Sequence, residues 1–499
     1  MRILFAVAVL ALAAGMAQAA TIDWQGGSTS LNNASQWYVL STNEPTDTTG
    51  ETRLPTVDDG AFVRNGTTVT LDSQINAGQF HVGGPSWTGG NPGMTTVLVQ
   101  PGGSLNGYAG SAFENTFEFR VGNAYPGQVI QTGGTVQATG VALANANIGF
   151  GNTGTYSISD GMLSVQSNAG MGIRLNIGYA TDTTPAGTGV FLQSGGLVET
   201  RSSGIEAYVD IGRGTGAVGT YNMSGGTLDV LAGAVGDIKK RYFAIGREGG
   251  TGYFNQSGGL VKTNWVRLGY NGALGQPVGA GYYNMTGGTL QAAYKFFIGR
   301  TEGGAPEGYG EFTANQAAVI DCTCDFIATA SGKVTLQIGS AADFGWTFGS
   351  NAGMYGEVEA ARTGGFCPVQ NQEWLLLTAT PNPAYSVVAA PSSITPGYSL
   401  DVRDNQIYLV FAPHSGDANI DGAVNVGDLG ILAGNWNQSG KNWYQADFTG
   451  DGSVNVGDLG VLAGNWGWTT PPGGLGNVPE PASLTLLALS GLALLRRRK

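Results

Sequence analysis

Charged side chains are scarce in this 499-residue chain, in which Asp, Glu, Lys and Arg together make up only 12%. That is too little charge for a disordered acidic chain, which depends on a high charge density to stay unfolded. The net charge is −12, and no large basic patch occurs, which argues against nucleic-acid binding. An acidic surface of this kind fits a protein that works outside the cell and is compatible with calcium.

Cysteine and histidine are also rare, and this excludes several kinds of site. Cys322, Cys324 and Cys367 are too few for a disulfide framework, although one bridge from Cys322 or Cys324 to Cys367 could form. A Cys-x-Cys metal site would need further ligands, and the sequence has none nearby. His81 and His414 are far apart and accompany no marked nucleophile, and no phosphate loop or zinc signature occurs. The sequence therefore nominates no catalytic residue.

Glycine, by contrast, is abundant, with 84 residues that recur at regular intervals. In a helix, glycine is less stable than alanine by roughly 1 kcal/mol, so this abundance argues against a mainly helical protein. Regularly placed glycines instead predict many tight turns between short strands. The expected fold class is therefore mainly β.

The N-terminus has the pattern of a secretory signal peptide. Arg2 forms the positive region, Ile3 to Ala14 form the apolar region, and Ala17 and Ala19 supply a small-x-small cleavage site. The apolar stretch is too short for a typical transmembrane anchor. Residues 1–19 are therefore predicted to be removed by cleavage near Ala19.

The middle of the chain consists of repeats of about 30 residues, which decides the expected architecture. Each unit has an aromatic or aliphatic residue, then a glycine turn, then an aliphatic pair; the units begin at Val129, Tyr156, Phe191, Tyr221, Phe254 and Tyr283. A second landmark, an aliphatic residue followed by glycine, recurs between the units, as in Ile211-Gly212 and Ile245-Gly246. Apolar residues at a spacing of two predict strands with one buried face, and glycines at the corners permit positive φ.

These repeats predict a right-handed parallel β-helix, or β-solenoid, over residues 20–331, followed by a β-rich cap over residues 332–412. Asn222, Asn255 and Asn284 each follow the aromatic residue and are expected to stack as a ladder. The repeats resemble the β-solenoid repeats of autotransporter-type proteins. In the alternative architecture each Gly-Gly pair closes an antiparallel hairpin, which would give a propeller or a sandwich.

Charged residues gather at the second landmark, at Arg213, Arg247-Glu248, Arg300 and Glu302. In a coil of stacked turns they would line up at one corner as an arginine stripe. One interpretation is a groove for an acidic sugar. The favoured interpretation is a solvated corner, because charged side chains lie mostly at the surface.

Residues 417–428 and 447–458 each fit the twelve-residue calcium loop of the EF-hand type. Such a loop has oxygen ligands at positions 1, 3, 5, 9 and 12, a backbone carbonyl at position 7, and glycine at position 6 for a sharp turn. The expected ligands of two Ca²⁺ ions are Asp417, Asn419, Asp421, Ala423, Asn425 and Asp428 in the first loop, and Asp447, Thr449, Asp451, Ser453, Asn455 and Asp458 in the second. Thr449 is a weaker ligand than the Asn419 that it replaces.

Each loop runs into an almost identical segment, from Asp428 to Trp436 and from Asp458 to Trp466. A duplicated calcium loop with one helix after each copy resembles the dockerin type I module, which would span residues 413–468. The resemblance implies a small α-helical domain that binds calcium and docks onto a cohesin-type partner through its helix faces.

At positions 10 and 11 of the loops this chain has Val426-Gly427 and Val456-Gly457, where well-known cohesin-binding dockerins have polar pairs. The alternative to docking is therefore that calcium folds the module as a structural clasp.

The C-terminus begins with Val478-Pro479-Glu480-Pro481, which is followed by an apolar run, Ala482 to Leu495, and four basic residues, 496–499. This pattern resembles the PEP-CTERM sorting signal, and a linker rich in Pro and Gly, residues 469–477, precedes it. The resemblance implies recognition by an exosortase, cleavage near the Pro-Glu-Pro, and delivery to the cell envelope, surface or extracellular matrix. The segment 478–499 is expected to form a hydrophobic helix that meets the membrane at least transiently.

These observations lead to two alternative hypotheses about function, which belong to different classes. The first is an exported surface protein with a structural, adhesive or glycan-binding role, whose calcium module docks or braces it. The second is a polysaccharide-degrading enzyme (a lyase or glycosidase) or its accessory subunit, anchored through the dockerin-like module. Glycoside hydrolysis needs two carboxylates at a set separation, and Asp160, Glu199, Glu206 and Asp210 are scattered in the sequence. The non-enzymatic function is therefore favoured.

Overall fold

The computed structural model describes residues 21–24, 30–40, 48–57, 59–64, 66–83, 93–108, 116–140, 143–167, 172–181, 183–202, 206–233, 240–270, 277–299, 308–382 and 386–469. They divide into two compact units. The stacked unit comprises the described residues of 21–366, 373–395 and 399–410. The loop–helix unit comprises residues 367–372, 396–398 and 411–469. The signal peptide, the linker beyond residue 469 and the C-terminal tail lie outside the described residues.

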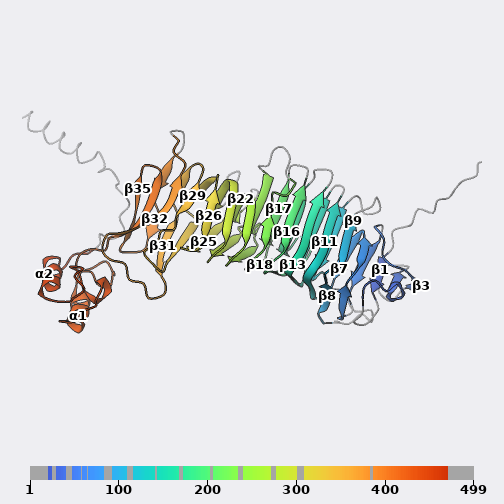
Figure 1. Ribbon diagram of the computed structural model, residues 1–499, viewed down its shortest axis with the longest axis horizontal. Helices are drawn as coiled ribbons and strands as arrows, with labels where there is room; N and C mark the ends of the chain where they lie inside the picture. Colours follow the sequence, from blue (N-terminus) through green and yellow to red (C-terminus); the bar gives the residue numbers. More distant parts are fainter. Residues whose placement is uncertain are drawn as a thin grey trace, which may run out of the picture. The chain divides into compact units, whose positions relative to one another are not determined.

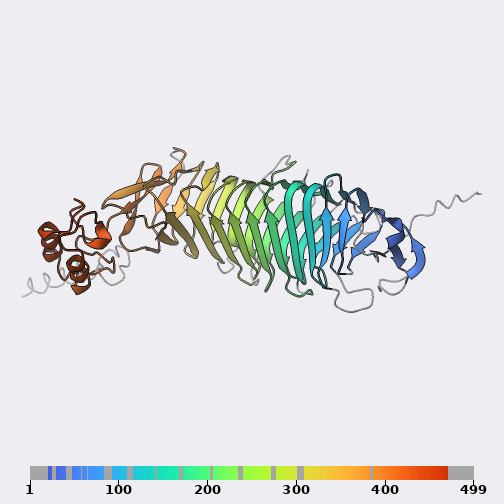
Figure 2. The ribbon, with the colours of Figure 1, turned by 60° about the horizontal axis from the view of Figure 1, so that its bottom comes forward.

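The stacked unit is mainly β, with a long and mostly parallel sheet. Strands that are about 30 residues apart pair in parallel, as Tyr221 does with Phe191 on one side and with Phe254 on the other. Three such ladders run through the unit, and each turn of the chain adds one segment to each ladder. The ribbons follow the order of the sequence, from blue to orange (Figure 1, Figure 2). Parallel pairing shows that the alternative of antiparallel hairpins is wrong, whereas the right-handed winding stays a prediction.

Within each ladder the strands stack in the order of the sequence. Ladder 1 consists of β1 (Thr21–Trp24), β4 (Gly60–Val63), β7 (Gln79–Val82), β10 (Thr116–Val121), β12 (Leu143–Phe150), β14 (Ile173–Tyr179), β17 (Ala207–Arg213), β20 (Arg241–Arg247), the second halves of β22 (Leu260–Tyr270) and β24 (Thr289–Ile298), β27 (Asp325–Ala328), β30 (Ala352–Met354) and β33 (Val387–Ala389). Ladder 2 consists of β5 (Thr68–Leu71), β8 (Thr95–Val99), the first halves of β11 (Gly127–Gly140) and β13 (Thr153–Ser167), β15 (Thr188–Gln193), β18 (Val218–Met223), β21 (Thr251–Gln256), β23 (Ala280–Met285), β25 (Tyr309–Asn315), β28 (Gly332–Ile338), β31 (Glu357–Arg362) and β34 (Ser393–Ile394). Ladder 3 consists of β6 (Gln74–Ala77), β9 (Ser104–Tyr108), the second halves of β11 and β13, β16 (Leu197–Ser202), β19 (Thr227–Asp229), the first halves of β22 and β24, β26 (Val319–Cys322), β29 (Trp346–Phe348), β32 (Gln372–Ala379) and β36 (Gln406–Phe411).

A few elements stand outside the three ladders. At the N-terminal end, β2 (Trp37–Leu40) pairs antiparallel with β1 and with β3 (Thr48–Thr52), next to the short 3-10 helix η1 (Ala34–Gln36). β35 (Tyr398–Arg403) precedes β36 near the other end. The loop–helix unit contains α1 (Val426–Gly434), the 3-10 helix η4 (Trp443–Gln445) and α2 (Val456–Gly464).

The inward side chains of ladder 2 form a column of aromatic rings. Tyr156 and Phe191 stack with their ring centroids 5.1 Å apart, and Phe191 and Tyr221 lie 4.6 Å apart. Tyr221, Met223 and Leu228 are all buried, which confirms the alternation that the sequence predicted. Aromatic pairs at these distances add stability beyond the area that they bury.

Buried glutamines alternate with apolar side chains along this column. Gln131, Gln193 and Gln256 each donate to two backbone carbonyls, and each accepts a hydrogen bond from the tyrosine of the next turn: Tyr156, Tyr221 and Tyr283, respectively. In the turns between, phenylalanine replaces tyrosine, and the earlier turn has an apolar residue in place of glutamine: Phe191 follows Ile158, Phe254 follows Met223 and Phe312 follows Met285. The core thus satisfies the hydroxyls of these three buried tyrosines by a partner one turn earlier, as buried polar groups require.

Glycine at the second landmark is required by both conformation and space. Gly246 has φ +70°, and a Cβ atom there would lie 1.9 Å from the carbonyl oxygen of Ala280 in the next turn. Its counterpart Gly212 has φ +67° and would meet the carbonyl oxygen of Thr251 at the same distance. Glycine adopts positive φ at little cost because it has no Cβ, so the corner glycines fix where each turn bends.

The ladders continue beyond residue 331, where the sequence motif ends. β28 pairs in parallel with β25, and β31 pairs in parallel with β28. The segment 332–395, expected as part of a cap, therefore stacks in the same way as the repeats. The physical reason is that parallel pairing uses backbone groups and needs only inward apolar residues such as Val334 and Val358, which are buried.

Candidate functional site

The first calcium-type loop, residues 417–428, is held in shape by its own aspartates. The Asp417 side chain is almost fully buried and accepts hydrogen bonds from the backbone N–H groups of Asp421 (3.2 Å) and Gly422 (3.0 Å). Gly422 has φ +85°, as the sharp turn at position 6 requires. Asn419 lies beside Asp421 and donates to its carboxylate at 2.8 Å, while Asp421 accepts from the N–H of Ala423 at 2.9 Å.

The last positions of this loop begin helix α1. The Asn425 side chain accepts from the N–H of Gly427 at 2.7 Å, and the Asp428 carboxylate accepts from the N–H of Asn425 at 2.9 Å, which forms a capping box. Asp428 also accepts from the N–H of Ala418 at 2.8 Å. Asn425, expected as a calcium ligand at position 9, therefore acts as the N-cap of a helix in this structure, and Asp428 braces the start of the loop.

The second loop, residues 447–458, repeats this arrangement. Asp447 accepts from the N–H of Gly452 at 2.8 Å, and Asp451 accepts from the N–H of Ser453 at 2.8 Å. Asn455 caps α2, and Asp458 accepts from its N–H at 2.9 Å. The hydroxyl of Thr449 donates to Asp458 at 3.1 Å, a contact that Asn419 does not make in the first loop.

In the loop–helix unit, each calcium-type loop pairs with the segment that follows the helix of the other half. Val424 of the first loop pairs with residues 467–468, which follow α2. Val454 of the second loop pairs with residues 437–438, which follow α1. Each loop is thus closed by the segment after the other helix, and the offset is 30 residues throughout. A further link comes from Trp443, whose indole N–H donates to the backbone oxygen of Asp417 at 2.8 Å.

Four buried carboxylates in this unit have no cationic partner among the described residues. Asp417, Asp428, Asp447 and Asp458 are at most 4% exposed, and none of the ion pairs between described residues includes them. The described residues of the unit contain six aspartates and no basic side chain except Lys441 and His414. Burying a carboxylate is costly unless a positive charge accompanies it, so the donor set is chemically suited to a hard cation.

Burial raises the pKa of Asp417, and the negative charges of Asp428 and Asp421 nearby raise it further, against the hydrogen bond from the Gly422 N–H that lowers it. The carboxylates at positions 1, 5 and 12 therefore repel one another. A cation between them would relieve this repulsion.

The two loops differ in how many acceptor sites remain free for a cation. A carboxylate offers about four acceptor positions. Backbone N–H groups use two of these on Asp417 and three on Asp428, and likewise two on Asp447 and three on Asp458. In the second loop the Thr449 hydroxyl, which has one proton, uses one more position on either Asp447 or Asp458. Within the described chain, no three His, Cys, Asp or Glu side chains form a metal-binding group by themselves. A cation would also need the amide oxygen of Asn419, backbone carbonyls and water.

Large apolar side chains are exposed at equivalent places in the two halves. Val426 and Val456, at position 10 of the loops, are 73% and 74% exposed. Trp436 and Trp466, after the helices, are 44% and 51% exposed. Large apolar side chains are thus exposed at the same place in both halves of the unit. The sequence showed these residues by their 30-residue offset, but their exposure became visible only in the fold.

The arginines at the second landmark of the repeats form an ionic cluster on the outer side of ladder 1. Arg213 and Arg247 lie next to each other in register, with side chains 15% and 12% exposed. Both approach the fully buried Asp210, at 3.9 and 3.4 Å, and both pair with Glu248. Arg174 joins at 3.6 Å from Asp210. The interpretation of a solvated corner is wrong for this part of the stripe, because the charges are paired with one another and tyrosine rings lie against the guanidinium groups of Arg213 and Arg247. Arg300 and Glu302 lie outside the described residues.

The carboxylates considered for catalysis are each engaged in the structure. Asp160 accepts from the N–H of Gly161, and Glu199 accepts from a serine and an arginine. Glu206 pairs with a lysine and Asp210 with arginines. Burial, helped by the charges of Arg120 and Arg64, holds the pKa of His81 well below its usual range. Among the described residues, no hydrogen bond joins any two of these groups.

Cys322, Cys324 and Cys367 form no disulfide bond with one another in the structure, so the bridge to Cys367 that the sequence left open is not present there. Cys322 and Cys324 are buried, and burial raises the pKa of Cys324.

Comparison with known proteins identifies a sorting motif at the C-terminus. The PEP-CTERM protein-sorting motif matches residues 477–499. This motif is recognised by exosortase and marks proteins that are exported and sorted to the cell envelope or surface, so this chain is an exported protein of that compartment. No curated protein matches the chain. No solved structure matches it. Among the residues with described positions, no helix is long and apolar enough to cross a membrane.

Proposed function

We propose that this exported protein is a structural or adhesive component of the envelope whose loop–helix unit is a calcium-dependent module of the dockerin type. The stacked unit would be a rigid β-solenoid body, and the module would couple it to a cohesin-type partner or brace it. The observation that carries the proposal is the set of four buried aspartates without a cationic partner among the described residues. A pair of Ca²⁺ ions would supply that missing charge.

The residues that would hold calcium are those predicted from the sequence, with one change. Asp417, Asn419, Asp421 and Asp428 remain suited as ligands of the first loop, with the backbone oxygen of Ala423. Asn425 caps the helix, so a water molecule would take its place at position 9, as is common in such loops. The first loop should bind more tightly, because its aspartates keep more free acceptor sites than those of the second.

Calcium titration of the whole exported chain tests this proposal. We expect two binding events by calorimetry and stabilisation of the loop–helix unit by about 2 to 3 kcal/mol at saturating calcium. Asp417→Asn should remove the tighter event and Asp447→Asn the weaker one. Asp401→Asn, on β35, is the matched control and should retain both. Absence of binding, or loss of no event in Asp417→Asn, would overturn the calcium role.

Docking is tested separately with an immobilised cohesin-type domain. We expect calcium-dependent retention of the chain and release by a chelator, because the helices position the exposed valines only when the loops are formed. Replacing Val426 and Val456 together by aspartate should abolish retention without altering the calcium stoichiometry. If calcium binds but no retention occurs, the module is a brace rather than a docking element.

The enzyme alternative has no comparable support. The four carboxylates considered for glycoside cleavage, Asp160, Glu199, Glu206 and Asp210, are held in ion pairs or hydrogen bonds. A lyase or glycosidase activity toward a polysaccharide, measured as release of reducing ends, would revive that alternative.

A further inference from the structure

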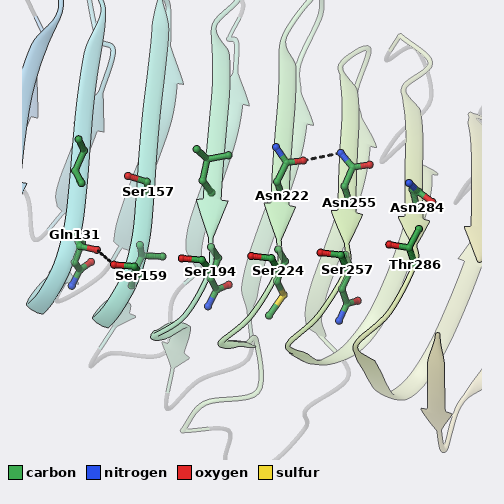
Figure 3. Close-up of a pocket in the computed structure, with 16 residues that line it drawn as sticks. Gln131, Ser157, Ser159, Ser194, Asn222, Ser224, Asn255, Ser257, Asn284 and Thr286 are labelled. Carbon is green, nitrogen blue, oxygen red and sulfur yellow. Dashed lines mark hydrogen bonds between the residues drawn. The ribbon is translucent and has the colours of Figure 1, made fainter. Parts of the chain in front are cut away.

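A groove of about 540 Å³ runs along the outer face of ladder 2, across strands β11, β13, β15, β18, β21 and β23 (Figure 3). Its walls are serine, threonine, asparagine, glutamine and a few aliphatic side chains, and none of its lining residues carries a charge. This distinguishes it from the ionic cluster on ladder 1. The groove runs in the direction in which the turns stack, so a ligand in it would contact one turn after another.

Two rows of polar groups follow the groove in register. Asn222, Asn255 and Asn284 occupy the same position in successive strands, and the Asn255 amide donates to Asn222 at 2.8 Å, which confirms the predicted asparagine ladder. Two residues further along each strand lie hydroxyls, among them Ser224 and Ser257, as Figure 3 shows. Neighbouring strands are about 4.7–4.9 Å apart, so identical polar groups recur at that interval.

The backbone of ladder 2 is not available to a ligand. Each strand in the groove floor is paired in parallel on both sides, as β18 is with β15 and β21. A peptide could therefore not add to the sheet as a further strand at this face. Recognition must use the side chains, whose hydroxyl and amide groups both donate and accept hydrogen bonds. One acceptor, the Oδ1 atom of Asn284, is buried and has no hydrogen-bond partner among the described residues.

Tyrosine rings stand on the same outward face, at the starts of the strands. Tyr253 and Tyr282 stack with centroids 5.0 Å apart and an interplanar angle of 12°. The ring of Tyr309, whose register partner is Ala280, lies 5.7 Å from that of Tyr282 and is tilted by 52°. Tyr253 and Tyr309 are each 39% exposed. An exposed aromatic surface beside a row of amides and hydroxyls suits a ligand that is apolar on its ring faces and polar at its edges.

We propose that this groove binds a neutral, extended polysaccharide that lies across the strands in the stacking direction. Sugar hydroxyls match the alternating donors and acceptors, and sugar ring faces match the tyrosines. An uncharged lining gives no attraction for a uronate or sulfate group, and the advance of one pyranose unit in an extended chain is close to the strand spacing. The site is separate from the docking role proposed above and does not depend on it.

Calorimetry with the whole exported chain tests the proposal, with cellohexaose, mannohexaose and xylohexaose as neutral probes and hexagalacturonate as the acidic probe. We expect at least one neutral probe to bind and the acidic probe not to bind. Asn255→Ala and Tyr253→Ala should each weaken binding about ten-fold. The first removes an amide that can donate to and accept from sugar hydroxyls, and the second removes an exposed aromatic ring. Both side chains point outward, so the fold should persist, as circular dichroism would verify.

Asn106→Ala provides the matched control. Asn106 also belongs to an asparagine pair between turns, with Asn76, but on ladder 3. Its replacement should leave binding unchanged. The proposal is overturned if no neutral probe binds, if only hexagalacturonate binds, or if Asn255→Ala and Asn106→Ala have equal effects.

Discussion

Replacing Gly246 by alanine is expected to destabilise the stacked unit by about 4 kcal/mol. Two costs combine at this corner. The backbone has φ +70°, a left-handed conformation that disfavours alanine, and the new Cβ would lie 1.9 Å from the Ala280 carbonyl oxygen. That oxygen belongs to the backbone of the next turn, so the clash can be relieved only by moving the strands apart. Urea unfolding, with hydrogen exchange of the β20 and β23 amides, would measure the loss.

Gly345→Ala separates these two costs. Gly345 has φ +63°, but a Cβ there has nothing within 4 Å among the described residues. Only the conformational penalty remains, and we expect a loss of about 1 kcal/mol. If Gly246→Ala and Gly345→Ala proved equally destabilising, the close approach between turns would not be the reason for the corner glycines.

Replacing Gln256 by leucine is expected to cost about 3 kcal/mol, although leucine is similar in size and more apolar. The change removes two hydrogen bonds to the carbonyls of Gly259 and Thr289, and it removes the acceptor of the Tyr283 hydroxyl, 2.5 Å away. The Tyr283 hydroxyl is fully buried and would keep only the weak sulfur acceptor of Met285. A buried donor without a partner costs about 1–3 kcal/mol. The free energy of unfolding in urea is the measurement.

A second substitution should recover part of that loss. Tyr283→Phe removes the stranded hydroxyl, so Gln256→Leu combined with Tyr283→Phe should be more stable than Gln256→Leu by about 1–2 kcal/mol. The chain already uses this apolar combination in other turns, where Phe254 follows Met223. Simple addition of the two single losses would show that the glutamine and the tyrosine are not coupled.

The sequence was sufficient to predict the strands and their period. Tyr221, Met223 and Leu228 alternate with polar residues, and this spacing alone places them on one face, which is buried in the structure. The repeated glycines predicted the corners, because few other residues tolerate positive φ. Likewise, the duplicated loop pattern predicted two equivalent loop–helix halves, and the structure has them at α1 and α2.

The sequence motif was a poorer guide to where the stacking ends. It stops near residue 331, yet β28 and β31 continue ladder 2. The motif reports the glycine corners and the aromatic position, whereas stacking depends on backbone hydrogen bonds and on any inward apolar side chain. Val334 and Val358 meet that need without matching the motif.

The sequence by itself determined the export signal, the repeat period, the inward alternation and the paired calcium-type loops, because each depends on residues close together in the chain or on exact recurrence. Only the tertiary structure decided which distant side chains meet. It enclosed Asp210 among arginines of three turns, gave Tyr283 its partner Gln256, and aligned Asn222 with Asn255 along a groove. The physical reason is that stacking brings residues about 30 positions apart to within one strand spacing, and the sequence records neither that contact nor the face on which it occurs.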